Sequence, residues 1–160
     1  FPLDSISITQ AWILFAYYER LNASQLKAAL KNWKSSNEQI STILTGYKTL
    51  LARLEREWDA FLAYDCPEEL AIEVEQLLPG IGKKLQLEVM KEVYLHLPIR
   101  SMKDIQIDGF GVKEALDLEK MGPLIGEVLQ ALQTEILSGK LANENTEIVS
   151  WIRNNFKESK

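Results

Sequence analysis

The sequence predicts an all-α fold of about seven or eight helices, arranged in two small packed lobes. Apolar residues recur every three or four positions along most of the 160 residues, as amphipathic helices require. Proline and glycine interrupt this periodicity at a few points, where helices are expected to begin or end. No segment alternates convincingly between apolar and polar residues, although residues 105–107 can form a few extended positions.

The first lobe, residues 1–64, is expected to contain three helices. Residues 6–21 are apolar on most sides, which is typical of a helix buried in a core. A second helix is expected over residues 24–33, because Ser24 can cap it and leucines recur four residues apart on one face. A third is expected over residues 36–62, which begin with a serine and a glutamine at capping-box spacing.

The second lobe, residues 65–160, starts where the helical pattern breaks before Pro67, a residue suited to the first position of a fourth helix. The Pro-Gly-Ile-Gly segment at residues 79–82 predicts a tight turn into a fifth helix over residues 83–96. A short helix follows over residues 112–118.

Two further helices complete the second lobe. Gly122 and Pro123 predict the start of an amphipathic helix, and Gly139 is expected to lie just past its end. The last helix is expected to be capped by Asn143 or Asn145.

Charge is distributed unevenly along the chain. The formal net charge is -5, yet residues 20–53 carry six basic side chains and one acid, a local balance of +5. The first lobe is therefore basic and the second acidic. One surface that contacts RNA on an otherwise solvated exterior is compatible with this asymmetry.

The composition excludes several kinds of site. Cys66 is the only cysteine and His96 the only histidine, so we expect no internal disulfide and no metal site in this chain. No apolar run is long enough to span a membrane and no export signal is recognisable, so a cytoplasmic location is expected. The chain opens on Phe1 rather than methionine, which suggests a piece of a longer protein or a processed product.

Lys27, Lys31 and Lys34 are the first candidates for RNA binding. Their spacings of four and three residues place them on one helix face, where ammonium groups can neutralise backbone phosphates. The alternative is an ordinary solvated face.

Lys83 and Lys84 form a second candidate, because the turn before them resembles the hairpin of helix-hairpin-helix modules, whose exposed amides hold a phosphate. A plain turn between helices is the alternative and is the more common use of such a sequence.

A third group lies in the second lobe. Arg100 and Lys103 flank its entry, and the turn at Gly122 can leave the amides of residues 124–126, including Gly126, free to bind a phosphate. Turn formation alone also explains these glycines. Four tryptophans can stack on bases, but their helical spacing favours core packing. They are Trp12, Trp33, Trp58 and Trp151.

Three segments in order resemble the C-terminal body and tail region of bacterial, Bacillus-type CCA-adding tRNA nucleotidyltransferases. The segments are Trp-Lys-Ser-Ser-Asn at 33–37, Leu-Pro-Ile-Arg-Ser-Met-Lys-Asp-Ile at 97–105 with Ile-Asp-Gly at 107–109, and Gly-Pro-Leu-Ile-Gly-Glu-Val-Leu at 122–129 with Ile-Leu-Ser-Gly-Lys-Leu-Ala-Asn at 136–143. The chain departs from the family pattern at Gly111-Val112 and at Leu124, which affects only details of the tail surface.

The resemblance implies a part of an enzyme that completes the 3′ CCA end of tRNA with CTP, ATP and Mg²⁺. Paired aspartates in a head domain and an acidic, base-reading motif in a neck carry that chemistry in the family. This chain has no D-x-D and no E-D-x-x-R string, so we expect no catalytic residue in it and no activity alone. The implied partners are the acceptor stem and T arm of tRNA and the N-terminal head and neck.

Two other functions remain open at this point. The acidic second lobe can dock a protein partner or a second copy of the chain as a homodimer. Alternatively, the turn at residues 79–82 can belong to a helix-hairpin-helix module that binds DNA.

Overall fold

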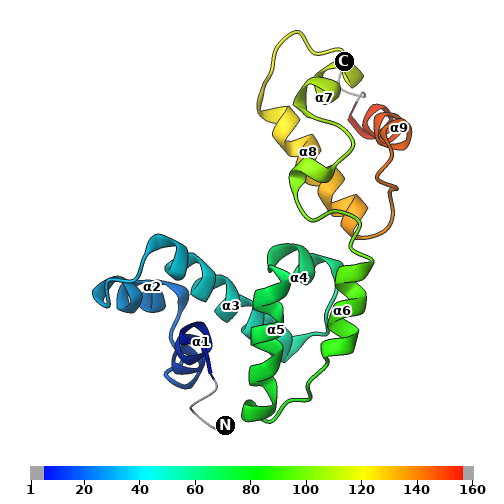
Figure 1. Cartoon of the computed structure of the whole chain (residues 1–160). Helices are drawn as coiled ribbons and strands as arrows, with labels where there is room; N and C mark the ends of the chain where they lie inside the picture. The colour runs from blue at the N-terminus through cyan, green and yellow to red at the C-terminus, as the bar shows by residue number, and fades with distance from the viewer. Residues whose placement is uncertain (1–5, 157–160) are drawn as a thin grey trace. The chain divides into compact units, whose positions relative to one another are not determined.

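The structure is a computed structural model that describes residues 6–156. Within this range the chain forms nine α-helices and no strand, which confirms the predicted all-α fold (Figure 1). Tertiary contacts divide it into two compact units, one ending at Leu95 and the other beginning at His96. We call these unit 1 and unit 2.

Unit 1 contains six α-helices and one short 3-10 helix. They are α1 (Ile8–Tyr18), α2 (Ala23–Asn32), α3 (Asn37–Glu55), α4 (Ala60–Asp65), α5 (Glu68–Leu77), η2 (Leu78–Ile81) and α6 (Leu87–Leu95). Unit 2 contains η3 (Met102–Asp104), α7 (Gly109–Ala115), α8 (Pro123–Leu137) and α9 (Asn145–Phe156).

The division falls after Leu95 rather than at residues 64/65, where the sequence suggested it. The reason is that α5 packs against α1 and α3. Val74 and Leu77 of α5 are fully buried in the same core as Ile13 and Leu50. Burial of this apolar face is what joins α4–α6 to the earlier helices.

The prediction of one continuous helix over residues 36–62 is wrong, because α3 ends at Glu55. Arg56 is extended, and its carbonyl accepts a hydrogen bond of 2.6 Å from Arg53 Nη1. Asp59 then starts α4 by accepting a hydrogen bond of 2.8 Å from the amide of Leu62. The N-cap at Asp59 explains why a new helix begins although the apolar spacing continues.

The fifth expected helix begins later than predicted, at Leu87 instead of residue 83. Gly82 adopts a left-handed backbone with φ +78° and ends the 3-10 helix before it. Residues 83–86 are not helical. The amide of Gln86 donates to Glu75 Oε2 at 2.8 Å, and this contact ties the segment to α5.

In unit 2 the short helix begins at Gly109, three residues before the expected start, because Asp108 caps it. The Asp108 carboxylate accepts a hydrogen bond of 2.9 Å from the amide of Gly111. The predicted limits of α8, from Pro123 to a residue just before Gly139, agree with the structure.

Asn143 and Asn145 hold the segment before α7. The Asn143 side chain accepts from the Gln106 amide at 3.0 Å and donates to the Asp104 carbonyl at 2.8 Å. Asn145 Nδ2 donates to the carbonyl of Gln106 at 2.8 Å. Their described hydrogen bonds therefore fix residues 104–106, and the extended positions expected there form no strand.

Candidate nucleic-acid interface

Helix α2 presents two of the predicted lysines to solvent. Asn22, rather than the expected Ser24, caps the helix in a reciprocal capping box with Gln25. Leu26 and Leu30 are completely buried beneath α2. Lys27 and Lys31 each follow one of these leucines, about 100° further round the helix, and both are exposed.

Lys34 lies beyond the end of α2 and not on the helix face where the sequence placed it. Its backbone is left-handed, with φ +55°. The Lys34 amide donates to the Lys31 carbonyl at 2.9 Å, and the Ser35 amide donates to the Leu30 carbonyl at 3.1 Å. This is a Schellman motif, a helix ending that satisfies the last carbonyls of the helix.

The charge on this part of the chain is not neutralised internally. Helix α2 contains no acidic residue, and no ion pair within residues 6–156 involves Lys27, Lys31 or Lys34. We call these three residues the α2 lysines. Three exposed ammonium groups without acidic partners suit contact with an external polyanion.

The turn before Lys83 does not offer the free amides that a helix-hairpin-helix hairpin requires. The Gly82 amide donates to the Pro79 carbonyl at 3.2 Å, and the Lys83 amide donates to the Leu78 carbonyl at 2.9 Å. Both amides are thus used inside the turn, and no helix follows until Leu87. The plain-turn interpretation fits this geometry better.

Lys83 and Lys84 instead line a surface hollow of about 300 Å³ with Arg53 and Arg56. Two acids, Glu55 and Glu57, also line it. Arg56 is already paired with Asp59 at 2.8 Å. The hollow therefore gathers basic groups that the sequence keeps apart, but their charge is largely balanced.

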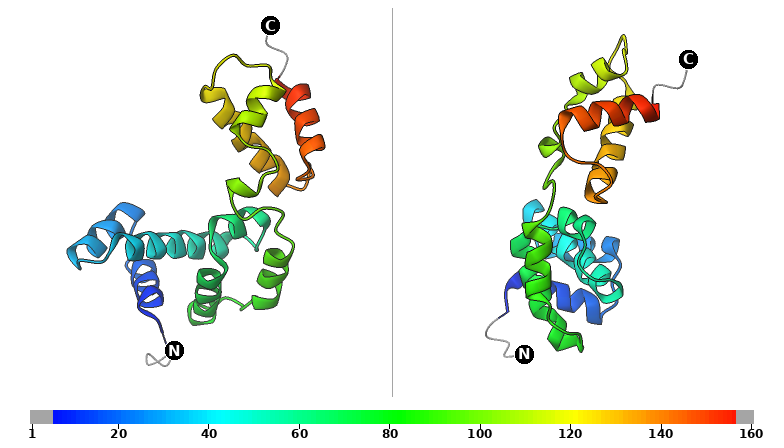
Figure 2. Two further views of the ribbon diagram at one scale, coloured as in Figure 1. Left: turned by 45° about the horizontal axis from the view of Figure 1, so that its top comes forward. Right: turned by 90° about the vertical axis from the view of Figure 1, so that its right-hand side faces the viewer.

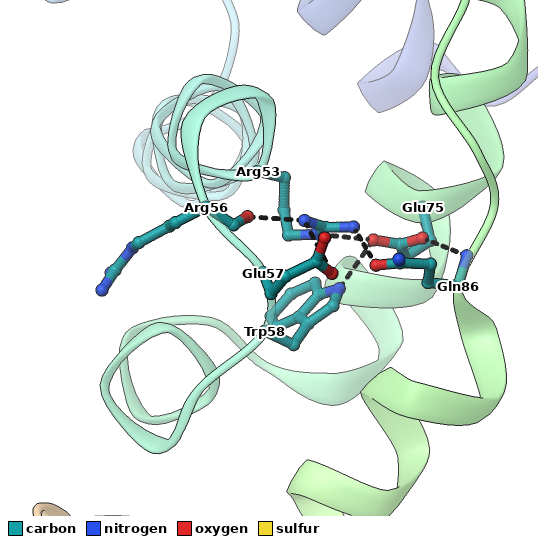
Figure 3. A network of polar contacts seen from close by, with 6 residues as sticks. All are labelled: Arg53, Arg56, Glu57, Trp58, Glu75 and Gln86. Carbon is teal, nitrogen blue, oxygen red and sulfur yellow. Dashed lines mark hydrogen bonds and ion pairs between the residues drawn. The ribbon is translucent and has the colours of Figure 1, made fainter.

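A buried polar network forms the floor of this region (Figure 3). Glu75 is completely buried, and its Oε1 accepts from Arg53 Nε at 2.7 Å and from Trp58 Nε1 at 2.6 Å. Arg53 Nη2 also donates to Gln86 Oε1 at 2.8 Å. The network joins the end of α3, the linker to α4, helix α5 and the segment before α6.

Sequence reasoning missed this network, although one signal was present. Arg53 continues the buried series of α3 three residues after Leu50, and Glu75 lies between the buried Val74 and Leu77. A charged residue in an apolar series at helical spacing is rare unless it is paired. An Arg and a Glu placed in this way on two helices indicate a buried ion pair.

Arg100 and Lys103 are exposed at the entry to unit 2. Asp104 accepts hydrogen bonds of 2.8 Å from the amides of Arg100 and Ser101. These bonds, the first from Arg100, lower the pKa of the Asp104 carboxyl. The carboxylate fixes the backbone here, so Arg100 projects from a defined position just before η3 and Lys103 from η3 itself.

Gly122 and Gly126 both lie on the exposed N-terminal part of α8. A Cβ atom at either position would meet nothing within 4 Å. Of the amides expected to be free, that of Ile125 donates to the Gly122 carbonyl at 3.1 Å. The packing of unit 2 therefore does not require glycine at either position.

The expectation that all four tryptophans are packed is wrong for Trp33. Its exposed fraction is 76%, whereas Trp58 is 5% exposed and donates to Glu75. Trp33 lies at the end of α2, where its ring forms a T-shaped pair with that of Trp12, with centroids 5.8 Å apart. Trp33 is left uncovered because it lies at the helix end, and the spacing of apolar residues alone does not reveal this exposure.

The residues 6–156 show no group of three His, Cys, Asp or Glu side chains that could hold a metal ion. Cys66 is buried, and burial raises the pKa of its thiol. None of the helices in this range combines the length and apolarity needed to cross a membrane.

A family model described as tRNA nucleotidyltransferase domain 2 matches residues 5–152. The chain belongs to this family. This tRNA nucleotidyltransferase domain thus covers both units, and the resemblance seen in the three sequence segments is confirmed.

The tRNA nucleotidyltransferase domain is similar to several CCA-adding enzymes. It is 28% identical to that of Enterococcus faecalis over 90% of the chain and 35% of the relative. It is 31% identical to that of Streptococcus mutans over the same shares of the two chains. The chain therefore spans about a third of the length of the curated relatives it matches.

The fold of the tRNA nucleotidyltransferase domain is also present in a solved structure. A crystal structure of the Bacillus stearothermophilus CCA-adding enzyme in complex with CTP matches with a TM-score of 0.81 and 23% identity. The match covers 95% of this chain and 39% of that one. At this identity the likeness shows the fold alone.

Proposed function

We propose that this chain is the tRNA-holding part of a CCA-adding tRNA nucleotidyltransferase. In this proposal the chain binds the acceptor stem and T arm of tRNA, so that a catalytic head can add CCA to the 3′ end of the tRNA. The proposal rests on the α2 lysines, which are exposed and have no ion-pair partner among residues 6–156, in a chain of this family.

The mode of recognition follows from the chemistry of these side chains. Ammonium groups bind phosphates as point charges, and a phosphate contact carries no information about the bases. A-form RNA also displays little sequence information in its deep groove. An enzyme that acts on every tRNA needs such sequence-independent contacts. Lys83, Lys84, Arg100 and Lys103, with the bare helix start at Gly122 and Gly126, are proposed as secondary phosphate contacts.

The chemical step is proposed to lie outside this chain. Nucleotidyl transfer from CTP and ATP with Mg²⁺ needs closely spaced carboxylates that bridge metal ions and triphosphate. We infer that a head and neck supply them, that the chain alone adds no nucleotide, and that it acts in the cytoplasm.

Charge reversal of the α2 lysines tests the proposal. The triple variant Lys27→Glu, Lys31→Glu, Lys34→Glu is expected to bind unmodified tRNA at least about tenfold more weakly, because three phosphate contacts become repulsive. Fluorescence anisotropy of end-labelled tRNA at a fixed salt concentration measures the affinity.

The matched control reverses three exposed lysines elsewhere, Lys91, Lys120 and Lys140. It changes the net charge by the same amount at other positions, and it also breaks the exposed ion pair of Lys91 with Glu88. Equal affinities of the two variants would contradict the assignment to α2, and no binding by the unaltered chain would reject the proposed function.

A further inference from the structure

Helix α1 has an apolar face that the described residues of unit 1 cover only in part: Trp12 is half-buried and packs against the core, whereas Ile8 and Phe15 beside it are exposed. Ile8, Trp12 and Phe15 recur at spacings of four and three, so they line one side of the helix. Ile8 is 72% exposed and Phe15 is 47% exposed. Trp33, at the end of α2, extends this surface by contact with Trp12. We call these four residues the α1 stripe.

The opposite side of α1 is already packed. Ile13 and Ala16 are completely buried, and α1 lies against α3 (Figure 2). The approach is close at Gly46, where an added Cβ would lie 2.6 Å from Ile13 Cδ1. Helix α1 is therefore apolar nearly all round, a composition that belongs to a helix enclosed on both sides.

The charges around the α1 stripe favour a protein partner over RNA. Residues Ile8–Tyr18 contain no charged side chain, and the next position in the series of the stripe is Glu19. Trp33 follows Leu30 by three residues, on the leucine side of α2, whereas Lys27 and Lys31 lie further round the helix. The four residues of the stripe carry no charge, and of the α2 lysines only Lys34 adjoins it, next to Trp33. An uncharged apolar face of this kind suits an apolar helix rather than phosphates.

We propose that the α1 stripe packs against a helix of the nucleotidyltransferase polypeptide outside the matched third. Relatives such as the Enterococcus faecalis enzyme are almost three times as long as the segment that this chain matches, so they contain additional protein able to cover such a face. The inference rests on the proposed function in one respect: it assumes that the chain works as part of a larger nucleotidyltransferase.

A chimera tests this contact without RNA. This chain replaces the matched third of the Enterococcus faecalis enzyme, and hydroxyl-radical labelling of Phe15 and Trp33 is compared between the chimera and the chain alone. Labelling is expected to fall at least about fivefold in the chimera, because covered side chains lose contact with solvent. The exposed Phe110 and Leu95 serve as reference positions and should keep their labelling.

The double variant Ile8→Lys, Phe15→Lys gives a second readout. It should leave the thermal midpoint of the chain alone nearly unchanged, because both side chains are exposed there. In the chimera it should lower the midpoint, because lysine is then forced into an apolar contact. A poorly folded chimera would show undiminished labelling of the stripe and would count against the proposal.

Three results would overturn the proposal: equal labelling in chimera and chain, an equal effect of the double variant on both, or protection in the chain alone that grows with its concentration. The last result would assign the stripe to a second copy. None of these measurements contains tRNA, so failure of the RNA-binding proposal is seen only in the anisotropy assay with the α2 lysine variants.

Discussion

Two basic residues of unit 1 adopt the left-handed backbone that ordinarily favours glycine. Arg20 and Lys34 have φ +53° and +55°, and each is the first residue past the cap of its helix. An L-residue in this conformation costs about 1–2 kcal/mol relative to the ordinary regions. Helix C-termini favour positive charge, which offsets part of this cost and also places a cation on the surface.

Replacement of Lys34 by glycine should therefore change stability and RNA binding in opposite directions. Lys34→Gly is expected to raise the free energy of unfolding by about 0.5–1 kcal/mol, because glycine relieves the backbone strain. It should weaken tRNA binding, because one phosphate contact is lost. Urea unfolding and anisotropy with labelled tRNA measure the two effects. Asp117→Gly, at φ +53° in unit 2, is the control and should not weaken tRNA binding.

The buried Glu75 should be far more sensitive to substitution than any surface acid. Glu75→Gln is expected to lower the free energy of unfolding by about 3–5 kcal/mol, because Arg53, whose side chain is 4% exposed, then loses its buried counter-ion. The exposed Glu57, 3.9 Å from Arg53 Nη1, is too far out in solvent to replace it. Asp65→Asn is the comparison, since Asp65 and Lys48 form an exposed pair and its loss should cost at most about 1 kcal/mol. Similar losses in the two variants would show that the buried pair contributes no more than a surface pair.

At the scale of elements, the sequence predicted helices well and their ends less well. Periodicity located α2, α3 and α8, because each has a continuous apolar face. It also extended α3 past Glu55, because Trp58 and Phe61 keep the helical spacing although the chain turns at Arg56. Contacts between distant residues, such as Trp58 with Glu75, decide such breaks, and a single sequence does not display them.

Two glycines, Gly126 within α8 and Gly139 just past its end, allow the effect of backbone conformation on stability to be measured without steric clashes. Gly126→Ala should raise the free energy of unfolding by up to about 1 kcal/mol, since alanine favours a helix interior. Gly139→Ala should lower it by about 1 kcal/mol, because φ there is +72°. Neither new methyl group meets an atom within 4 Å, so urea unfolding reports the backbone alone. A loss of stability in Gly126→Ala would contradict this account.

At the scale of the whole molecule, the sequence indicated two parts and a concealed basic segment, but it placed their boundary too early. The break before Pro67 is only a turn between α4 and α5, and the division at Leu95 depends on how α5 packs against α1 and α3. The exposure of Lys27 and Lys31 followed from the helical pattern. The exposure of Trp33 did not, because it depends on which neighbours reach the end of α2.

A net charge of -5 makes the salt dependence of binding a test of where RNA is held. If the α2 lysines contact phosphates, log affinity for tRNA should fall linearly with log salt concentration, with a contribution of roughly -0.7 to -0.9 per contact. Reversal of all three should therefore flatten the slope by about 2–3, measured by anisotropy between 50 and 200 mM salt. A variant that binds more weakly with an unchanged slope would indicate damage to the fold instead, because only lost ion contacts reduce the number of counterions released.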